Sequence, residues 1–128
     1  MTPRILIVDD NPINLKLACD VLQAAGFCVS RAADAEEAQD VLARVAPDLI
    51  LMDIALPGMD GLSLTRLLKA DPQFKNIPIV ALTAFAMKGD DQKALDAGCC
   101  GYICKPIETR NLARQVHSFL TGIDGTSP

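Results

Sequence analysis

Five polar residues stand directly after short apolar segments of this 128-residue chain. Asp9 and Asp10 follow Ile-Leu-Ile-Val, Asp53 follows Leu-Ile-Leu-Met, Thr83 follows Ile-Val-Ala-Leu, and Lys105 follows Tyr-Ile-Cys. Each segment has the length and composition typical of a buried strand. Because parallel strands carry their carboxyl ends to one edge of a sheet, we expect three carboxylates, one hydroxyl and one ammonium to converge there.

Three carboxylates in one place predict a cation. Two carboxylates about 4 Å apart repel each other by roughly 4 kcal/mol at an effective dielectric constant of 20. An oxygen-only set of ligands, without His or Cys, favours a hard ion such as Mg²⁺. With this ion, Asp53 is the candidate nucleophile for an aspartyl phosphate. The hydroxyl of Thr83 would donate to a phosphoryl oxygen, and Lys105 would offset the charge that develops there.

Other interpretations of the same residues remain open. Asp9 and Asp10 could serve to cap a helix and complement its dipole. Thr83 could be an ordinary strand residue, and Lys105 could form a structural ion pair with Asp53. Pro106 constrains the bond after the lysine and is compatible with a cis peptide that aims the ammonium inward.

Several classes of site are excluded by what the sequence lacks. The turn from Asp9 to Asn14 has no glycine, so it is neither a dinucleotide-binding turn nor a phosphate loop. A Gly-x-Ser-x-Gly nucleophile elbow is also missing. The single histidine, His117, is expected on a solvated face of the last helix. Cys99 and Cys100 are adjacent and unsuited to bridging each other, and the five cysteines have no zinc-site spacing, so we expect reduced thiols.

Bulk composition limits the partners and the compartment. The net charge of -4 argues against a nucleic-acid binder. No apolar stretch approaches the roughly 20 residues of a membrane span. The chain opens with Met-Thr-Pro-Arg, without a signal peptide, so we expect a cytoplasmic protein that binds neither nucleic acid nor membrane.

Helical patterns alternate with the strands. Asn11 caps a helix that begins at Pro12 and stops at Gly26, and Asp34 with Glu37 resembles a capping box. Four of the five helices have a clear inward face. In chain order, the expected inward residues of the first, second, third and fifth helices are Ile13, Leu17, Ala18, Val21, Leu22 and Ala25; Ala38, Val41, Leu42 and Val45; Leu64, Leu67 and Leu68; and Leu112, Val116, Phe119 and Leu120. The fourth helix, expected over 86–97, is only weakly amphipathic.

This alternation predicts an α/β fold with a doubly wound, five-stranded parallel sheet in the order 2-1-3-4-5, the flavodoxin-like (βα)5 arrangement. Residues 27–31 are half-polar and suit an edge strand of that sheet. One domain over residues 1–121 and a flexible tail over 122–128 account for the chain.

The motifs resemble the receiver domain of two-component response regulators. They are Ile-Leu-Ile-Val-Asp-Asp-Asn, Leu-Ile-Leu-Met-Asp-Ile-x-Leu-Pro-Gly-Met-Asp-Gly, Pro-Ile-Val-Ala-Leu-Thr-Ala and Cys-Lys-Pro. The stretch 83–90 further resembles single-domain receivers of the DivK cell-fate type. Similar sequences occur in receivers attached to hybrid kinases.

The resemblance implies a role for each site residue. Asp53 would be the phosphoacceptor, Asp10 and Asp53 would ligate Mg²⁺ directly, and Asp9 would act mainly through a water on the metal. The backbone carbonyl of Ala55 would complete the metal site. Thr83 and Tyr102 match the switch pair of the family, in which the hydroxyl turns to the phosphate and the ring moves inward.

The resemblance also implies partners. A histidine kinase or histidine phosphotransfer protein would supply the phosphoryl group, and a downstream signalling protein would read the change. We expect a monomer that dimerises, if at all, on phosphorylation, and a phosphoacceptor rather than an enzyme. The alternatives are a receiver excised from a hybrid kinase or larger regulator, and a Mg²⁺-dependent aspartyl-phosphate phosphatase. Ala55 disfavours the phosphatase, because such enzymes usually place a second acid there.

Overall fold

Strands and helices alternate along the chain in the computed structural model, which describes residues 2–54, 60–83, 90–104 and 107–121. The elements are β1 (Arg4–Val8), α1 (Pro12–Ala24), β2 (Cys28–Ala32), α2 (Ala35–Leu42), β3 (Leu49–Asp53), α3 (Gly61–Lys69), β4 (Ile79–Thr83), α4 (Asp90–Ala97), β5 (Gly101–Cys104) and α5 (Leu112–Thr121). No helix in this part of the chain is long and apolar enough to cross a membrane.

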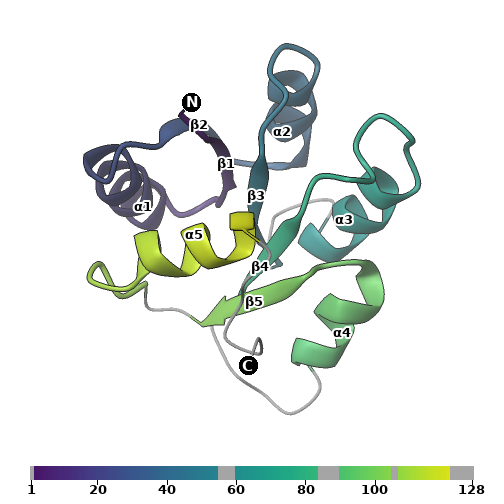
Figure 1. The fold of residues 1–128 in the computed structure, drawn as a ribbon. Coiled ribbons are helices and arrows are strands. Elements are labelled where there is room, and N and C mark those ends of the chain that lie inside the picture. Colours follow the sequence, from purple (N-terminus) through teal and green to yellow (C-terminus); the bar gives the residue numbers. More distant parts are fainter. Residues whose placement is uncertain (1, 55–59, 84–89, 105–106, 122–128) are drawn as a thin grey trace.

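The strands form one parallel sheet in the order β2-β1-β3-β4-β5, as predicted. Helices cover both faces of this sheet, with α1 and α5 on one side and α2, α3 and α4 on the other (Figure 1). Each face has its own apolar core. The strands β3 and β4 are buried along their whole length because helices lie over both of their faces.

The predicted helix starts are confirmed. The side chain of Asn11 accepts hydrogen bonds from the backbone N–H groups of Ile13 and Asn14. Asp34 accepts from the N–H of Glu37, whose carboxylate in turn accepts from the N–H of Ala33. These bonds satisfy backbone donors that have no partner within the helix.

Four of the expected inward residues are exposed instead. Ile13 is 77% exposed, Leu17 37% and Leu67 49%, and Ala25 is also exposed. In α1 the buried face is centred on Ala18, Cys19 and Leu22, so residues 13 and 17 fall on the opposite side of the helix. In α3 the buried stripe consists of Gly61, Leu64, Thr65 and Leu68, and Leu67 falls beside it.

The remaining expectations about the elements are largely confirmed. Gly26, with φ of 98°, directly follows the cap of α1, a position that favours glycine. The edge strand predicted over 27–31 is observed one residue later, and α2 ends at Leu42, before the expected Val45. The helix expected over 86–97 is observed from Asp90 to Ala97, and its first four residues lie outside the described part.

Candidate functional site

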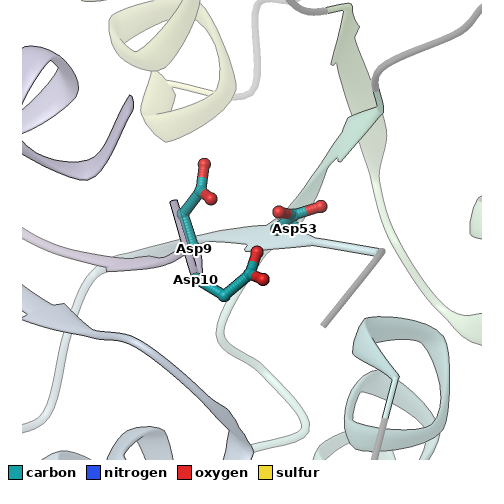
Figure 2. A group of neighbouring side chains, drawn as sticks. All are labelled: Asp9, Asp10 and Asp53. Atoms are coloured by element: carbon teal, nitrogen blue, oxygen red, sulfur yellow. The ribbon is translucent and has the colours of Figure 1, made fainter. Parts of the chain in front are cut away.

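The carboxyl edge of the sheet gathers the three aspartates at the ends of β1 and β3. Asp9 and Asp10 directly follow β1, and Asp53 is the last residue of β3. In the register of these strands Val8 lies beside Met52, so Asp9 comes next to Asp53. One carboxylate oxygen from each of the three residues lies within 4.8 Å of the others, and Figure 2 shows the side chains grouped there.

Burial differs within this cluster. Asp9 is 1% exposed and Asp53 is 3% exposed, whereas Asp10 is exposed. The N–H of Asn11 donates to Oδ1 of Asp9 at 2.9 Å, and this bond fixes the orientation of that carboxylate. Two buried carboxylates and one open to solvent therefore form a pocket of negative charge with access from outside.

The donor set fits a hard divalent cation. Three carboxylates this close repel one another, and a cation among them removes that repulsion. Within the described residues, no His or Cys belongs to the cluster, and oxygen ligands are those that Mg²⁺ prefers. Exposed Asp10 would leave room for the waters that Mg²⁺ usually keeps.

Thr83 lies close to this edge, and Tyr102 lies farther along the sheet. Thr83 is the last residue of β4, is 3% exposed, and follows Leu82, the register partner of Asp53. Tyr102 pairs in register with Ala81, two residues before Thr83, and is 40% exposed. The strands thus place Thr83 near the carboxylates and leave the ring of Tyr102 partly in solvent.

Three predicted site residues lie outside the described part of the chain: Ala55, Lys105 and Pro106. Their roles stay predictions. His117 is exposed on α5, as expected for a residue on a solvated face.

Comparison with known sequences places this architecture in a family. The family model of the response regulator receiver domain matches residues 5–117. The chain belongs to this family. The receiver domain inferred from the motifs is therefore confirmed. The observed strand order likewise confirms the flavodoxin-like fold predicted from the alternation of strands and helices.

Among its relatives are polar-differentiation response regulators. DivK of Brucella ovis is 43% identical over 120 residues, which make up 94% of this receiver and 98% of that protein. DivK of Brucella anthropi is 42% identical over the same shares of the two chains. These sequence identities confirm the predicted resemblance to receivers of the DivK type.

Solved receivers have the same fold. The receiver domain of a sensor histidine kinase from Pseudomonas aeruginosa PAO1, with a magnesium ion coordinated in its active site cleft, is 36% identical, with a TM-score of 0.85. The match covers 94% of this chain and 99% of that one. The chemotaxis response regulator CheY4 of Vibrio cholerae is 27% identical with a TM-score of 0.86, over 91% of this chain and 98% of its own.

Gly61 packs against the site, although the sequence analysis assigned it no role there. A Cβ atom at this position would overlap the backbone carbonyl of Asp53, and the N–H of Gly61 donates to the carbonyl of Ile54 at 3.3 Å. Asp60 caps the same helix by accepting from the N–H of Ser63. The start of α3 is thus packed directly against the strand end that carries Asp53. The Met-Asp-Gly sequence was the available signal.

Proposed function

We propose that this receiver is a phosphorylation-operated switch whose phosphoacceptor is Asp53. The observation that carries the proposal is the buried carboxylate of Asp53 at the end of β3, with carboxylate oxygens of Asp9 and Asp10 within 4.8 Å. A nucleophile held against two further carboxylates suits the transfer of a phosphoryl group with Mg²⁺ bound.

Each residue has a distinct task in this proposal. An oxygen of Asp53 forms a bond to phosphorus while the P–N bond of a phosphohistidine breaks, and the departing imidazole takes up a proton. Asp10 and Asp53 would ligate Mg²⁺ directly and Asp9 would act mainly through a water on the metal. The ion would offset the negative charge of the carboxylates and of the phosphoryl oxygens. Asn11 orients Asp9 through its N–H group. Ala55 would add a carbonyl ligand.

The switch would lie along β4 and β5. The hydroxyl of Thr83 donates to a phosphoryl oxygen, Lys105 pairs with the phosphate charge, and Tyr102 moves inward to follow Thr83. Support comes from the order of the strands, which places Thr83 beside the site and Tyr102 on the next strand in a half-exposed position. The surface of α4, β5 and α5 would then change for a downstream protein.

The partners follow from the chemistry and from the relatives. A histidine kinase or a histidine phosphotransfer protein would supply the phosphoryl group, and a signalling protein would recognise the switched surface. DivK is named a polar-differentiation response regulator, so we propose a DivK-like regulatory role, with the protein as a phosphoacceptor and not an enzyme. A second candidate role is that of a receiver within a hybrid kinase, because a kinase receiver domain is 36% identical to this chain.

Intact-mass spectrometry tests the proposal. The protein is incubated with phosphoramidate, whose P–N bond imitates phosphohistidine, in the presence of Mg²⁺ or of a chelator. We expect one phosphoryl adduct that needs Mg²⁺, that is absent from Asp53→Asn, and that is retained in Asp20→Asn. Asp20 is the matched control because it is an exposed aspartate paired with Lys16 on α1. An adduct in Asp53→Asn, or none in the wild type, would contradict the proposal.

A second test measures metal binding without phosphorylation. Since Mg²⁺ would bind only the folded state, an ion concentration ten times its Kd should stabilise the protein by about 1.4 kcal/mol. Thermal unfolding should show a higher Tm in Mg²⁺ for the wild type and for Asp20→Asn, and a much smaller shift for Asp10→Asn. An equal shift in all three proteins would mean that the ion binds elsewhere.

A further inference from the structure

Two cysteines flank Tyr102: Cys104 is the last residue of β5, and Cys100 directly precedes its first residue. The side chains of Cys100, Tyr102 and Cys104 are exposed, whereas Ile103 between them is 3% exposed and belongs to the core beneath α5. The N–H of Cys100 donates to the carbonyl of Ile79 at 2.9 Å, so the pairing with the segment of β4 continues to this residue. Because side chains alternate along extended chain, the three exposed side chains share one face, in the order Cys-Tyr-Cys. The order reads the same in both directions.

β5 is an edge strand without a charged residue. The described sheet ends in β2 on one side and β5 on the other, and Figure 1 shows β5 as the outermost strand. Edge strands are usually protected from pairing by charged side chains or proline. β2 carries Arg31, but the segment from Cys100 to Cys104 has no charge. Of the two edges, β5 is therefore the one suited to pairing with another strand.

Symmetry makes a second copy of this chain the matching partner. In an antiparallel pair centred on Tyr102, Cys100 of each copy lies opposite Cys104 of the other. Opposed Cα atoms in antiparallel strands are about 4.5–5.5 Å apart, and a disulfide spans Cα atoms about 4.4–6.8 Å apart. We propose that two copies associate through β5 around a two-fold axis and that two reciprocal Cys100–Cys104 disulfides lock the pair. This inference does not depend on phosphorylation of Asp53.

The oxidant would be a peroxide. One thiol of a facing pair attacks an oxygen of hydrogen peroxide, the O–O bond breaks, and a sulfenic acid and water form. The facing thiol then attacks that sulfur, and a second water leaves as the S–S bond closes. Two thiols and one peroxide thus give one disulfide and two waters. A thiol reductant reverses the oxidation.

The other three cysteines are poorly placed to form a disulfide between two copies. Cys19 and Cys99 are buried, and burial raises the pKa of both thiols, that of Cys99 to about 11. Cys28 is exposed but begins β2 at the opposite edge of the sheet. It therefore provides a matched control for an exposed thiol on an edge strand.

Mixing two variants, one lacking Cys100 and the other lacking Cys104, tests the proposed register between the β5 strands of the two copies, in which Cys100 faces Cys104. All variants carry Cys28→Ser. The Cys28→Ser protein treated with hydrogen peroxide should give a covalent dimer on a non-reducing gel, and the wild-type protein should do the same. Cys100→Ser alone and Cys104→Ser alone should stay monomeric, because each remaining thiol faces a serine. An equimolar mixture of the two variants should regain about half the dimer yield, since half of the random pairs place a Cys opposite a Cys.

Three results would overturn the inference. The first is a failure of the Cys28→Ser protein to cross-link. The second is cross-linking of either single variant by itself as efficiently as in the mixture, which would indicate like-with-like pairing or random collision. The third is a mixture that gives no dimer although the Cys28→Ser protein does. Circular dichroism of each variant confirms that the comparison is made between folded proteins.

Discussion

The units β3–α3 and β4–α4 share one topology but differ in how their helices are fixed. α3 has a side-chain cap at Asp60, packs Gly61 against the backbone of Asp53, and buries Leu64 and Leu68. In α4, the residues from 92 to 97 bury only the small side chains of Ala94 and Ala97, and Leu95 is 45% exposed.

Under the proposed function, this difference would separate the site of phosphoryl transfer, beside α3, from the surface that a partner recognises, at α4. The burial of a leucine stabilises a helix on its sheet by far more than the burial of an alanine, because the apolar area removed from water is larger. α3 is held firmly against the strand end that carries Asp53. The residues of α4 from 92 to 97 bury less apolar side-chain area, which would give this part of the helix a lower local stability and let it shift at small cost.

The largest effect expected from this comparison is in the core of the β3 unit. Leu64 of α3 is fully buried, so Leu64→Ala should lower the free energy of unfolding by about 2–5 kcal/mol. Leu95→Ala removes the same atoms from a half-exposed position in α4 and should cost less than about 0.5 kcal/mol. Urea unfolding measures both, and similar losses would erase the contrast between the two units.

A smaller effect is expected at the start of α3. Gly61→Ala would force a Cβ onto the carbonyl of Asp53, so either the strand end or the helix must shift, at a cost of about 1–3 kcal/mol. Because the shift occurs at the site, labelling by phosphoramidate should slow as well. The control Arg66→Ala, at an exposed position of the same helix, should change neither stability nor labelling. Normal labelling in Gly61→Ala would show that this packing does not position Asp53.

The smallest effect at neutral pH concerns Cys99, which packs between the two units. Burial raises the pKa of its thiol from 9.0 to about 11, while a hydrogen bond with Thr65 and the charge of Lys69 act in the opposite direction. The unfolded chain therefore loses this proton at a lower pH than the folded protein does. The stabilisation is fully present below pH 9 and is lost as the pH rises towards 11.

Unfolding measured between pH 8 and pH 11 checks this linkage. Stability of the wild type should fall more steeply over this interval than that of Cys99→Ala, which lacks the thiol. Equal slopes would mean that Cys99 titrates as it does in the unfolded chain. Cys28→Ala, which removes an exposed thiol at the opposite edge of the sheet, is the control and should retain the wild-type slope.

The sequence was sufficient for the parts of this molecule that depend on local pattern. Buried strand segments, the caps at Asn11 and Asp34, and the fixed direction of parallel strands predict both the sheet order and the meeting of Asp9, Asp10 and Asp53. These features depend on short segments and on a topological rule, so neighbouring residues suffice to predict them.

The exposure of some side chains and the contacts between distant segments depend on tertiary packing, so local sequence patterns could not predict them. Ile13, Leu17 and Leu67 have the spacing of inward residues, but the rotation of each helix on the sheet places them outward. The contact of Gly61 with the carbonyl of Asp53 joins two segments whose closeness appears only after folding. The burial of Cys99 beside exposed Cys100 likewise depends on how α3 and α4 pack, which no local pattern encodes.

The position of the phosphoryl group is the most direct test of the central claim. Protein labelled with phosphoramidate and Mg²⁺ is reduced with borohydride, which converts an aspartyl phosphate to homoserine, and its peptides are sequenced by tandem mass spectrometry. We predict homoserine at position 53 alone, with unmodified aspartate at positions 9 and 10. Homoserine at either of those positions, or at none, would contradict the assignment of Asp53 as the phosphoacceptor.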